Sequence, residues 1–425
     1  MVINIIAVAI ITVIVKGFGF YKEIVVASNF GLSELLDTFL IASLVPGFIY
    51  QVFLNAFTSV FIPNYILEQK SERPISSFQA TSFIVTISTT VFFMIFAYLF
   101  TNTFLEQFFP NHSEAYYNLI KVQFIYILPC ILFWGLSSLL SGLLNIYDDF
   151  KYATLYPVFS SISVLVLLLF FKDVFQERVL AVGILIGSIL EFLFLLIVSK
   201  HKKIIQISKP DFRTEGTNLM FNQLPAKVSS GFLSGLIPVT DQYFAAQLIV
   251  GSIAALNYAI KIPAFFIAIA VMALAKVLLP HFSKLIVENK QEASKQLNKI
   301  LKFVFLSLVI AIIPIILFSD NIVSFIFERN EFTSEDALLV SKLQIILLIS
   351  APFYICDNII VQFLTSLNKN AFMAYVSFGS MTLNIILNYI FIQFYGIYGI
   401  VLCTTTIYIV RSFVLYTYAR KQNKI

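Results

Sequence analysis

The stretch KGFGFYKEIVVASNFGLSELLDTFLIASLVPGFIYQVFLNAFTSVFIP, from Lys16 to Pro63, indicates the fold because it places charges inside apolar sequence. Most of it is apolar enough to lie in a bilayer. Charge at membrane depth is costly, so it is kept where it faces a protein interior or a water-filled cavity. Glycine and proline loosen helices where a transporter must bend. The stretch therefore favours a membrane transporter over a membrane anchor, on these residues: Lys16, Lys22, Glu23, Asp37, Gly17, Gly19, Gly31 and Pro46.

The composition is that of a polytopic membrane protein. Of the 425 residues, 59% are hydrophobic and only 12% are charged, whereas a soluble domain has roughly 25% charged residues. At about 20 residues per crossing, we predict an all-α protein with about twelve transmembrane helices. The first run lacks a basic leader, so we interpret it as a span rather than a cleavable signal. The predicted runs are residues 3–30, 37–66, 77–103, 117–146, 152–171, 179–199, 218–249, 251–282, 298–318, 336–366, 371–394 and 396–419.

Every second loop of the chain is rich in basic residues. They are concentrated after every second run and in the C-terminal tail, and the loop after residue 199 is the richest. By the positive-inside rule, both termini are predicted to be cytoplasmic, in the inner membrane of a bacterium. The net charge of +5 follows from these loops and predicts no nucleic-acid partner.

An internal repeat divides the chain. Pro46 and Pro63 recur 217 residues later as Pro263 and Pro280, within similarly apolar sequence. Because six spans precede the second copy, the halves have the same orientation, which is typical of two lobes related by pseudo-two-fold symmetry. The predicted parts are an N-lobe (1–199), a basic cytoplasmic linker that is either a surface helix or an ordinary connection (200–217), and a C-lobe (218–425).

No catalytic constellation is recognisable. The three histidines have no plausible triad partners, and no GxxxxGK[ST] motif is present for ATP hydrolysis. Cys130, Cys356 and Cys403 lack metal-ligand spacing and are expected to pack as small apolar residues. We therefore predict a protein that is not an enzyme and has no cofactor, and whose energy comes from an ion gradient, the membrane potential or the substrate gradient.

The intramembrane lysines suggest an anionic ligand. Lys16 and Lys22 are roughly 240° apart around an unbroken helix, and the glycines between them predict a break that would bring both into one cavity. Lys227, Lys261 and Lys276 lie in apolar runs of the second half, together with Asp241. A predominantly cationic cavity attracts a phosphate-bearing headgroup. The alternative is that lysines near helix ends extend to the membrane interface.

A second cluster is polar and mostly uncharged. Asn384 and Asn388 are four residues apart and so share a helical face, and Thr404, Thr405 and Thr406 lie in the next span. With a carboxylate, such oxygen ligands suit a hard cation such as Na⁺. The alternative is hydrogen bonding that holds membrane helices together.

The chain resembles the MurJ/MviN lipid II flippases of the multidrug/oligosaccharidyl-lipid/polysaccharide (MOP) exporter superfamily. The resemblance rests on Lys16–Pro63 and on NYAIKIPAFFIAIAVMALAKVLLPHFSK and IFERNEFTSEDALL further along the chain. It implies a two-lobe transporter that moves an isoprenoid-diphosphate-linked saccharide from the inner to the outer leaflet, and glycosyltransferases or a polymerase of the same pathway as candidate partners. It also implies Na⁺ or H⁺ as a coupling ion.

The resemblance also assigns roles to individual residues. The diphosphate cavity of the family corresponds to Lys16, Lys22, Glu23, Asp37 and Lys261. A sodium site in the second lobe of the family resembles Asp241, Asn384, Asn388, Thr404 and the carbonyl of Ile400. No other metal site is expected.

Several departures from the family pattern widen the range of substrates. Lysine replaces arginine at all three cationic positions, which removes the bidentate fork. A further family arginine falls at Tyr50, an acidic residue at Leu54, and an aspartate of the sodium site at Asn388. The chain has twelve predicted spans where the family usually has fourteen. A surface-polysaccharide repeat unit is therefore as compatible with the sequence as lipid II.

Three other classes of function remain open. A multidrug or cation antiporter of the same superfamily would need an acidic or aromatic cavity, which the cationic first helix disfavours. A membrane enzyme would need a catalytic site on an outer loop, and these loops are short and poor in histidine. An inert membrane scaffold would leave the buried lysines without a purpose.

Overall fold

The computed structural model describes residues 2–70, 74–110, 112–367 and 369–422, and these residues form helices, turns and one isolated bridge between Arg329 and Phe332. The predicted all-α class is confirmed. Every predicted apolar run coincides with a helix or a broken helix, for example 3–30 with α1 (Val2–Phe30). Among the described residues, nine helices are long and apolar enough to cross a membrane. The protein is a multi-pass membrane protein.

The chain forms two compact units. Unit 1 comprises residues 1–30 and 34–235, and unit 2 comprises residues 31–33 and 236–425. Each unit has its own buried core, and the two are described separately below. The lobe boundaries at residues 199 and 218 stay a prediction.

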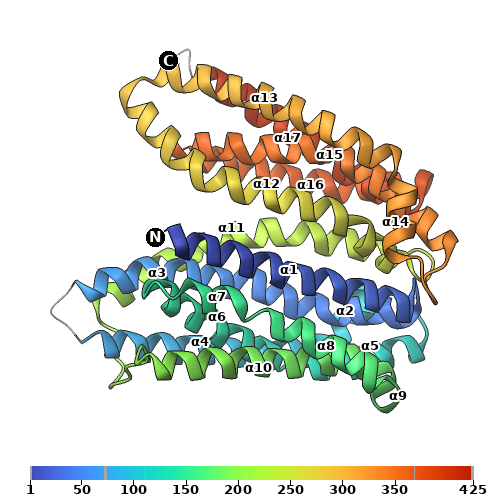
Figure 1. The fold of residues 1–425 in the computed structure, drawn as a ribbon, viewed down its shortest axis with the longest axis horizontal. Coiled ribbons are helices and arrows are strands. Elements are labelled where there is room, and N and C mark those ends of the chain that lie inside the picture. The colour runs from blue at the N-terminus through green and yellow to red at the C-terminus, as the bar shows by residue number, and fades with distance from the viewer. Residues whose placement is uncertain (1, 71–73, 111, 368, 423–425) are drawn as a thin grey trace. The chain divides into compact units, whose positions relative to one another are not determined.

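Unit 1 is a bundle whose helices alternate in direction. In Figure 1 the start of α1, the end of α3 and the linker after α10 lie at one end, and α9 lies at the other. Its elements are α1, α2 (Glu34–Ile49), the π-helix η1 (Tyr50–Leu54), α3 (Asn55–Gln69), α4 (Ile75–Phe108), α5 (Glu114–Ile127), α6 (Cys130–Ile146), α7 (Phe150–Leu155), α8 (Val158–Phe170), α9 (Lys172–Phe175), η2 (Gln176–Arg178), α10 (Val179–His201) and most of α11 (Glu215–Ala245).

Several crossings of unit 1 are irregular helices. The predicted run 37–66 becomes α2, η1 and α3, with Pro46 inside α2. The helices α7 and α8 are separated at Pro157. Proline has no backbone N–H and its ring obstructs the preceding turn, so a helix bends or ends there. Extra π-type turns often lie at functional positions. The π-helical segment and the break at Pro157 are therefore the points at which unit 1 can bend.

The linker after α10 is a non-helical connection that is hydrogen-bonded to the start of α4. It is therefore an ordinary connection and not a surface helix. Gln79 donates to the carbonyl of Ile204 over 3.0 Å and accepts from the backbone N–H of Gln206 over 2.8 Å. The hydroxyl of Ser77 donates to the carbonyl of Lys209 over 2.8 Å. These bonds satisfy backbone groups that a helix would otherwise have paired internally.

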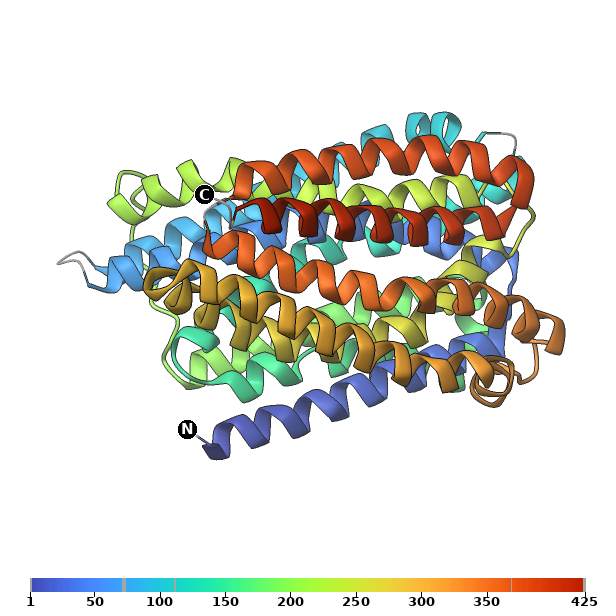
Figure 2. The ribbon, with the colours of Figure 1, turned by 90° about the horizontal axis from the view of Figure 1, so that it is seen from above.

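Unit 2 is built around one long helix, α15 (Ser334–Ser366). A reciprocal pair of side-chain bonds between Thr333 and Asp336 caps its N-terminus. It packs against α12, α13, α14 and α17, and Figure 2 shows α13, α15 and α17 running beside one another. The remaining bounds are α12 (Ser252–Glu288), α13 (Lys290–Leu317), α14 (Ser319–Phe327), α16 (Asn370–Tyr395) and α17 (Ile397–Lys421).

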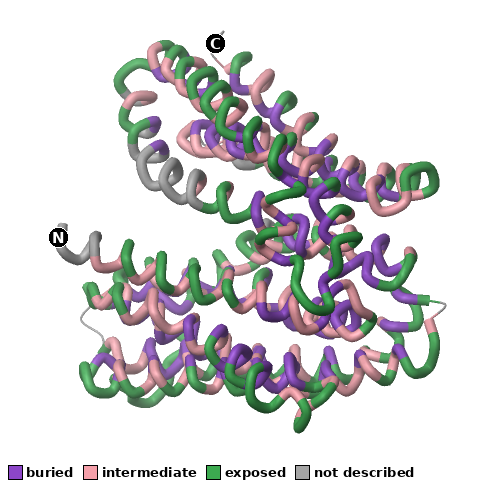
Figure 3. Tube along the Cα trace, turned by 45° about the vertical axis from the view of Figure 1, so that its right-hand side comes forward, coloured by how far each residue is buried: buried purple, intermediate pink, exposed green. Residues whose placement is uncertain are grey.

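The burial pattern is that of a protein solvated by lipid. On α13 the outward side chains are large and apolar, with Phe303 72% and Ile310 62% exposed. The interior of unit 2 is also apolar, around Phe282, Leu297 and Phe363. Figure 3 shows buried and exposed positions alternating along the same helices. Because both faces of these helices are apolar, polar residues in the interior need a specific explanation.

Candidate functional site

The cationic residues of α1 do not share one side of the helix. The sequence predicts a break at Gly17 and Gly19, and this prediction is wrong, because α1 is continuous through both positions. The six-residue spacing therefore keeps Lys16 and Lys22 on different sides, with Lys16 exposed and Lys22 half-buried. A glycine is compatible with a straight helix when the backbone hydrogen bonds have no water to compete with them.

Lys22 is paired with its neighbour. Its ammonium nitrogen lies 2.9 Å from Oε1 of Glu23, and the two side chains are 27% and 17% exposed. The carboxylate offsets part of the cost of holding an ammonium group in apolar surroundings. It leaves the remaining N–H groups of Lys22 able to donate to a ligand.

Asp37 is a buried carboxyl group in the first turn of α2. Its side chain is 3% exposed, and a negative charge is favoured at this end of a helix by the backbone dipole. The next residue, Thr38, accepts a hydrogen bond from Gln123 over 2.9 Å, which joins α2 to α5. These contacts fix Asp37 in the core of unit 1.

Lys261 lies in unit 2, on α12, and its side chain is half-buried. Tyr258 and Ile262 beside it are buried at 0% and 5% exposure. Helix α12 continues through Pro263, a proline of the internal repeat. Of the other candidate lysines, Lys227 is exposed, and the side chain of Lys276 lies outside the described residues.

The polar cluster of unit 2 gathers around Asp241 of α11. Asn384 and Asn388, one turn apart on α16, donate to Oδ1 of Asp241 over 3.2 and 2.8 Å. Thr404 of α17 donates to Oδ2 over 3.0 Å. Helix α11 and the consecutive helices α16 and α17 thus meet at one carboxylate. No described contact joins the buried Ile400 to Asp241, and Thr405 donates instead to the carbonyl of Ile346 over 3.0 Å.

The donor atoms of this cluster suit a hard monovalent cation. Asn384 and Asn388 are fully buried, and their side-chain oxygens have no hydrogen-bond partner. Unpaired buried acceptors are unusual and need a partner. A half-turn of each carboxamide would direct both oxygens toward Asp241, giving the all-oxygen surroundings that hard cations prefer. Within the described residues, no group of three His, Cys, Asp or Glu side chains offers an alternative metal site.

The sequence model of the lipid II flippase MurJ family matches residues 26–425. The chain belongs to the MurJ family. It is 28% identical to the probable lipid II flippase MurJ of Buchnera aphidicola subsp. Schizaphis graminum over 414 residues, which is 90% of this chain and 79% of that protein. It is 25% identical to the Rickettsia prowazekii protein of the same name, over 98% of this chain and 83% of that one.

Solved structures show the same fold. The lipid II flippase MurJ in an inward closed conformation matches with a TM-score of 0.83 at 24% identity, over 98% of this chain and 87% of that chain. An inward-facing multidrug resistance MATE transporter of the MOP superfamily matches with a TM-score of 0.80 at 14% identity, over 99% and 98%. The two-lobe MOP fold expected from the resemblance is confirmed.

Unit 2 of this MurJ family member contains an ion pair that was not predicted from the sequence. Nε of Arg411, on α17, lies 3.3 Å from Oδ1 of Asp357, on α15, and the side chains are 22% and 5% exposed. The signal was available, since Arg411 is the only charged residue of the run 396–419. Glu191 is likewise the only charged residue of the run 179–199, and it is 5% exposed.

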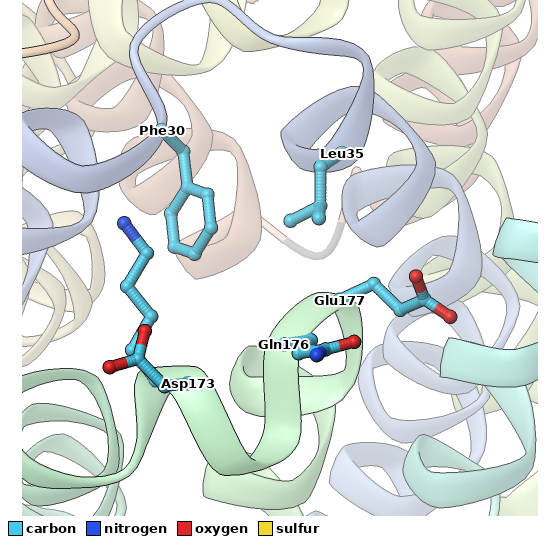
Figure 4. A pocket seen from close by; sticks show the side chains of 6 residues that line it. Phe30, Leu35, Asp173, Gln176 and Glu177 are labelled. Carbon is cyan, nitrogen blue, oxygen red and sulfur yellow. The ribbon is translucent and has the colours of Figure 1, made fainter.

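A cavity of about 450 Å³ lies at the end of unit 1 that carries α9 (Figure 4), and no predicted site residue lines it. Lys172 fastens one wall: its ammonium group donates to the carbonyl of Asn29 over 3.4 Å and lies 5.3 Å from the ring centroid of Phe30. Asp173 and Glu177 add opposite charge. The cavity has no net preference for an anionic ligand, so it is not a second site for a diphosphate.

Proposed function

We propose that this protein moves an undecaprenyl-diphosphate-linked saccharide from the cytoplasmic to the outer leaflet of a bacterial inner membrane by alternating access. The observation that carries the proposal is the match to the lipid II flippase MurJ family over residues 26–425. The saccharide is that of lipid II or of a surface-polysaccharide repeat unit. Transport requires no bond to form or break, so the proposed role is not that of an enzyme.

The proposed ligand contacts are the charges within membrane helices. Lys16, Lys22 and Lys261 would attract the diphosphate as point charges. Glu23, which already pairs with Lys22 at 2.9 Å, would exchange that contact when the diphosphate arrives. Asp37 would couple ligand binding to closure, from its position at the start of α2. Glycosyltransferases that complete the saccharide on the cytoplasmic side are the proposed suppliers of the substrate.

Proteoliposomes containing a fluorescent undecaprenyl-diphosphate saccharide test the proposal directly. Wild-type protein should make the headgroup accessible from the opposite leaflet, and Lys22→Ala and Lys261→Ala should slow this transfer. The exposed Lys151 and Lys302 provide matched controls, since Lys151→Ala and Lys302→Ala remove the same charge elsewhere. Equal rates in all four variants would refute the residue roles. Transport of organic cations without lipid transfer would instead support the antiporter.

The proposed coupling ion is Na⁺ at Asp241. Asn384, Asn388 and Thr404 would supply the other ligands, and the cation would neutralise a carboxylate that is otherwise costly at membrane depth. The ligand role of Ile400 stays a prediction. Binding of a cation at this carboxylate would link the state of unit 2 to an ion gradient.

The proposed orientation places both termini in the cytoplasm. The native cysteines, Cys130, Cys356 and Cys403, are free and buried, so a new cysteine can be labelled selectively. A cysteine at Lys203, in the linker, should react with a membrane-impermeant maleimide only after the cytoplasmic side is opened. A cysteine at Asp173, in α9, should react from outside in intact cells. The reverse pattern would contradict the proposed orientation.

A further inference from the structure

Glu191 is a buried carboxyl group of unit 1 that the proposed mechanism does not use. It lies on α10 and its side chain is 5% exposed. Within the described residues, it forms no ion pair with a lysine, arginine or histidine. Burial away from any cation disfavours the ionised form of a carboxyl group.

The packing of α10 against α8 brings this carboxyl group to a helix start. Gly183, Gly187 and Glu191 follow at four-residue spacing along one buried stripe of α10. A methyl group at Gly187 would overlap Cα of Ser160, and one at Gly183 would meet Cα of Val164 at 3.0 Å. The two helices therefore touch through backbone, as small residues allow between membrane helices.

This close approach gives the ionised form of Glu191 one compensating contact. The backbone N–H of Ser160, in the first turn of α8, lies within hydrogen-bonding reach of the Glu191 carboxylate. First-turn N–H groups have no partner inside their own helix, and the helix dipole favours negative charge there. Burial therefore favours the protonated form of Glu191, whereas the Ser160 N–H and the helix dipole favour the ionised form. A small movement of α8 changes the balance between these two forms.

A π-helical segment and a helix break meet beside Glu191. Tyr50 begins the π-helix η1, and Tyr156 stands at the break between α7 and α8. Their hydroxyl groups are within hydrogen-bonding reach of each other, and both residues lie in the electrostatic field of Glu191. The remaining titratable group that faces it is Cys130 of α6; no charged side chain of α5 or α8 among the described residues does so.

We propose that Glu191 is a proton-binding site of unit 1, and that gain and loss of its proton bias the conformation of the π-helix at Tyr50–Leu54 and of the break at Pro157. The ligand is the proton itself. The loaded form is neutral and compatible with close packing of α10 on α8. The unloaded form is an anion that draws the Tyr50 and Tyr156 hydroxyl groups and the Ser160 N–H toward it. Only the role of this proton in transport rests on the proposed function.

The single tryptophan of the chain reports on this site. The ring of Trp134 on α6 packs against Tyr50 with the centroids 5.7 Å apart. A pH titration of its fluorescence in lipid nanodiscs should show a one-proton transition in the wild type. Glu191→Gln keeps the shape and the acceptor for Ser160, so it should abolish this transition, whereas Glu191→Asp should keep it with a shifted midpoint.

A second buried glutamate of unit 1 provides the control. Glu68 is 2% exposed and accepts the backbone N–H of Gly216 over 3.0 Å, and Glu68→Gln should leave the transition unchanged. Absence of a transition in the wild type, or its persistence in Glu191→Gln, would overturn the proposal. In the proteoliposome assay, Glu191→Gln should lose the pH dependence of lipid transfer. If no lipid is transferred at any pH but the fluorescence results hold, the proposed function fails and the proton site stands.

Discussion

Arg411 and Asp357 form an ion pair between α17 and α15 in the apolar interior of unit 2, with 3.3 Å between Nε and Oδ1. Neither residue belongs to the proposed diphosphate or cation contacts. Removing one partner of a buried ion pair leaves an uncompensated charge, which costs about 3–5 kcal/mol. Replacing both partners by apolar residues of similar volume is often neutral.

A double-mutant cycle should therefore show strong coupling at this pair. Arg411→Met and Asp357→Leu should each destabilise the protein by about 3–5 kcal/mol, and the double variant by much less than the sum. Unfolding of the detergent-solubilised protein, followed by circular dichroism, measures these changes. Additive losses would show that the two charges do not interact.

The Asp241 cluster predicts that Na⁺ stabilises the protein. A ligand that binds only the folded state adds about 2.7 kcal/mol when present at a hundred times its dissociation constant. We expect the melting temperature to rise with NaCl but not with choline chloride at equal ionic strength. Asp241→Asn should abolish the difference between the two salts. Thr382→Val provides a control, because Thr382 is an exposed residue of α16 that bonds only its own helix. An unchanged salt difference in Asp241→Asn would remove this carboxylate from the cation site.

Because Lys22 is paired with Glu23, we predict that lipid transfer depends on the positive charge of Lys22 more than on the packing of its side chain. Lys22→Arg keeps the cation and adds a bidentate fork, so lipid transfer should be retained or faster. Lys22→Gln should slow it by about tenfold or more, which corresponds to about 1.4 kcal/mol of lost stabilisation. The proteoliposome assay compares both with Glu23→Gln, which leaves the cation in place. Equal slowing by Arg and Gln would indicate a packing role for Lys22.

Substitution by alanine should affect the stability of the protein differently at two glycines of the stretch Lys16–Pro63. Gly31 has φ +51°, and a methyl group there would overlap the carbonyl of Glu331, so Gly31→Ala should cost about 1–3 kcal/mol. Gly17 lies inside the continuous helix α1 with no atom within 4 Å of an added methyl group. Gly17→Ala should be neutral or stabilise by up to about 1 kcal/mol. Thermal unfolding distinguishes the two, and a similar loss at Gly17 would mean that it is a bending point after all.

The positions of the helices were predictable because hydropathy and proline placement act locally. The predicted run 77–103 lies within α4, and the run 371–394 lies within α16. Helical periodicity also placed Asn384 and Asn388 on one face, and both contact the same carboxylate. At Gly17 and Gly19 the same local reasoning failed, because in a membrane glycine does not by itself interrupt a helix.

What the sequence alone determined is the placement of the apolar helices along the chain and the inclusion of charged residues within them, since both follow from the transfer of side chains out of water. Only the tertiary structure decided which group each charge meets. Asp357 meets Arg411 and Glu191 meets the start of α8, across sequence separations at which no periodicity constrains the partner. The physical reason is that apolar helices can pack in many ways, and buried polar groups find their partners only when one packing is chosen.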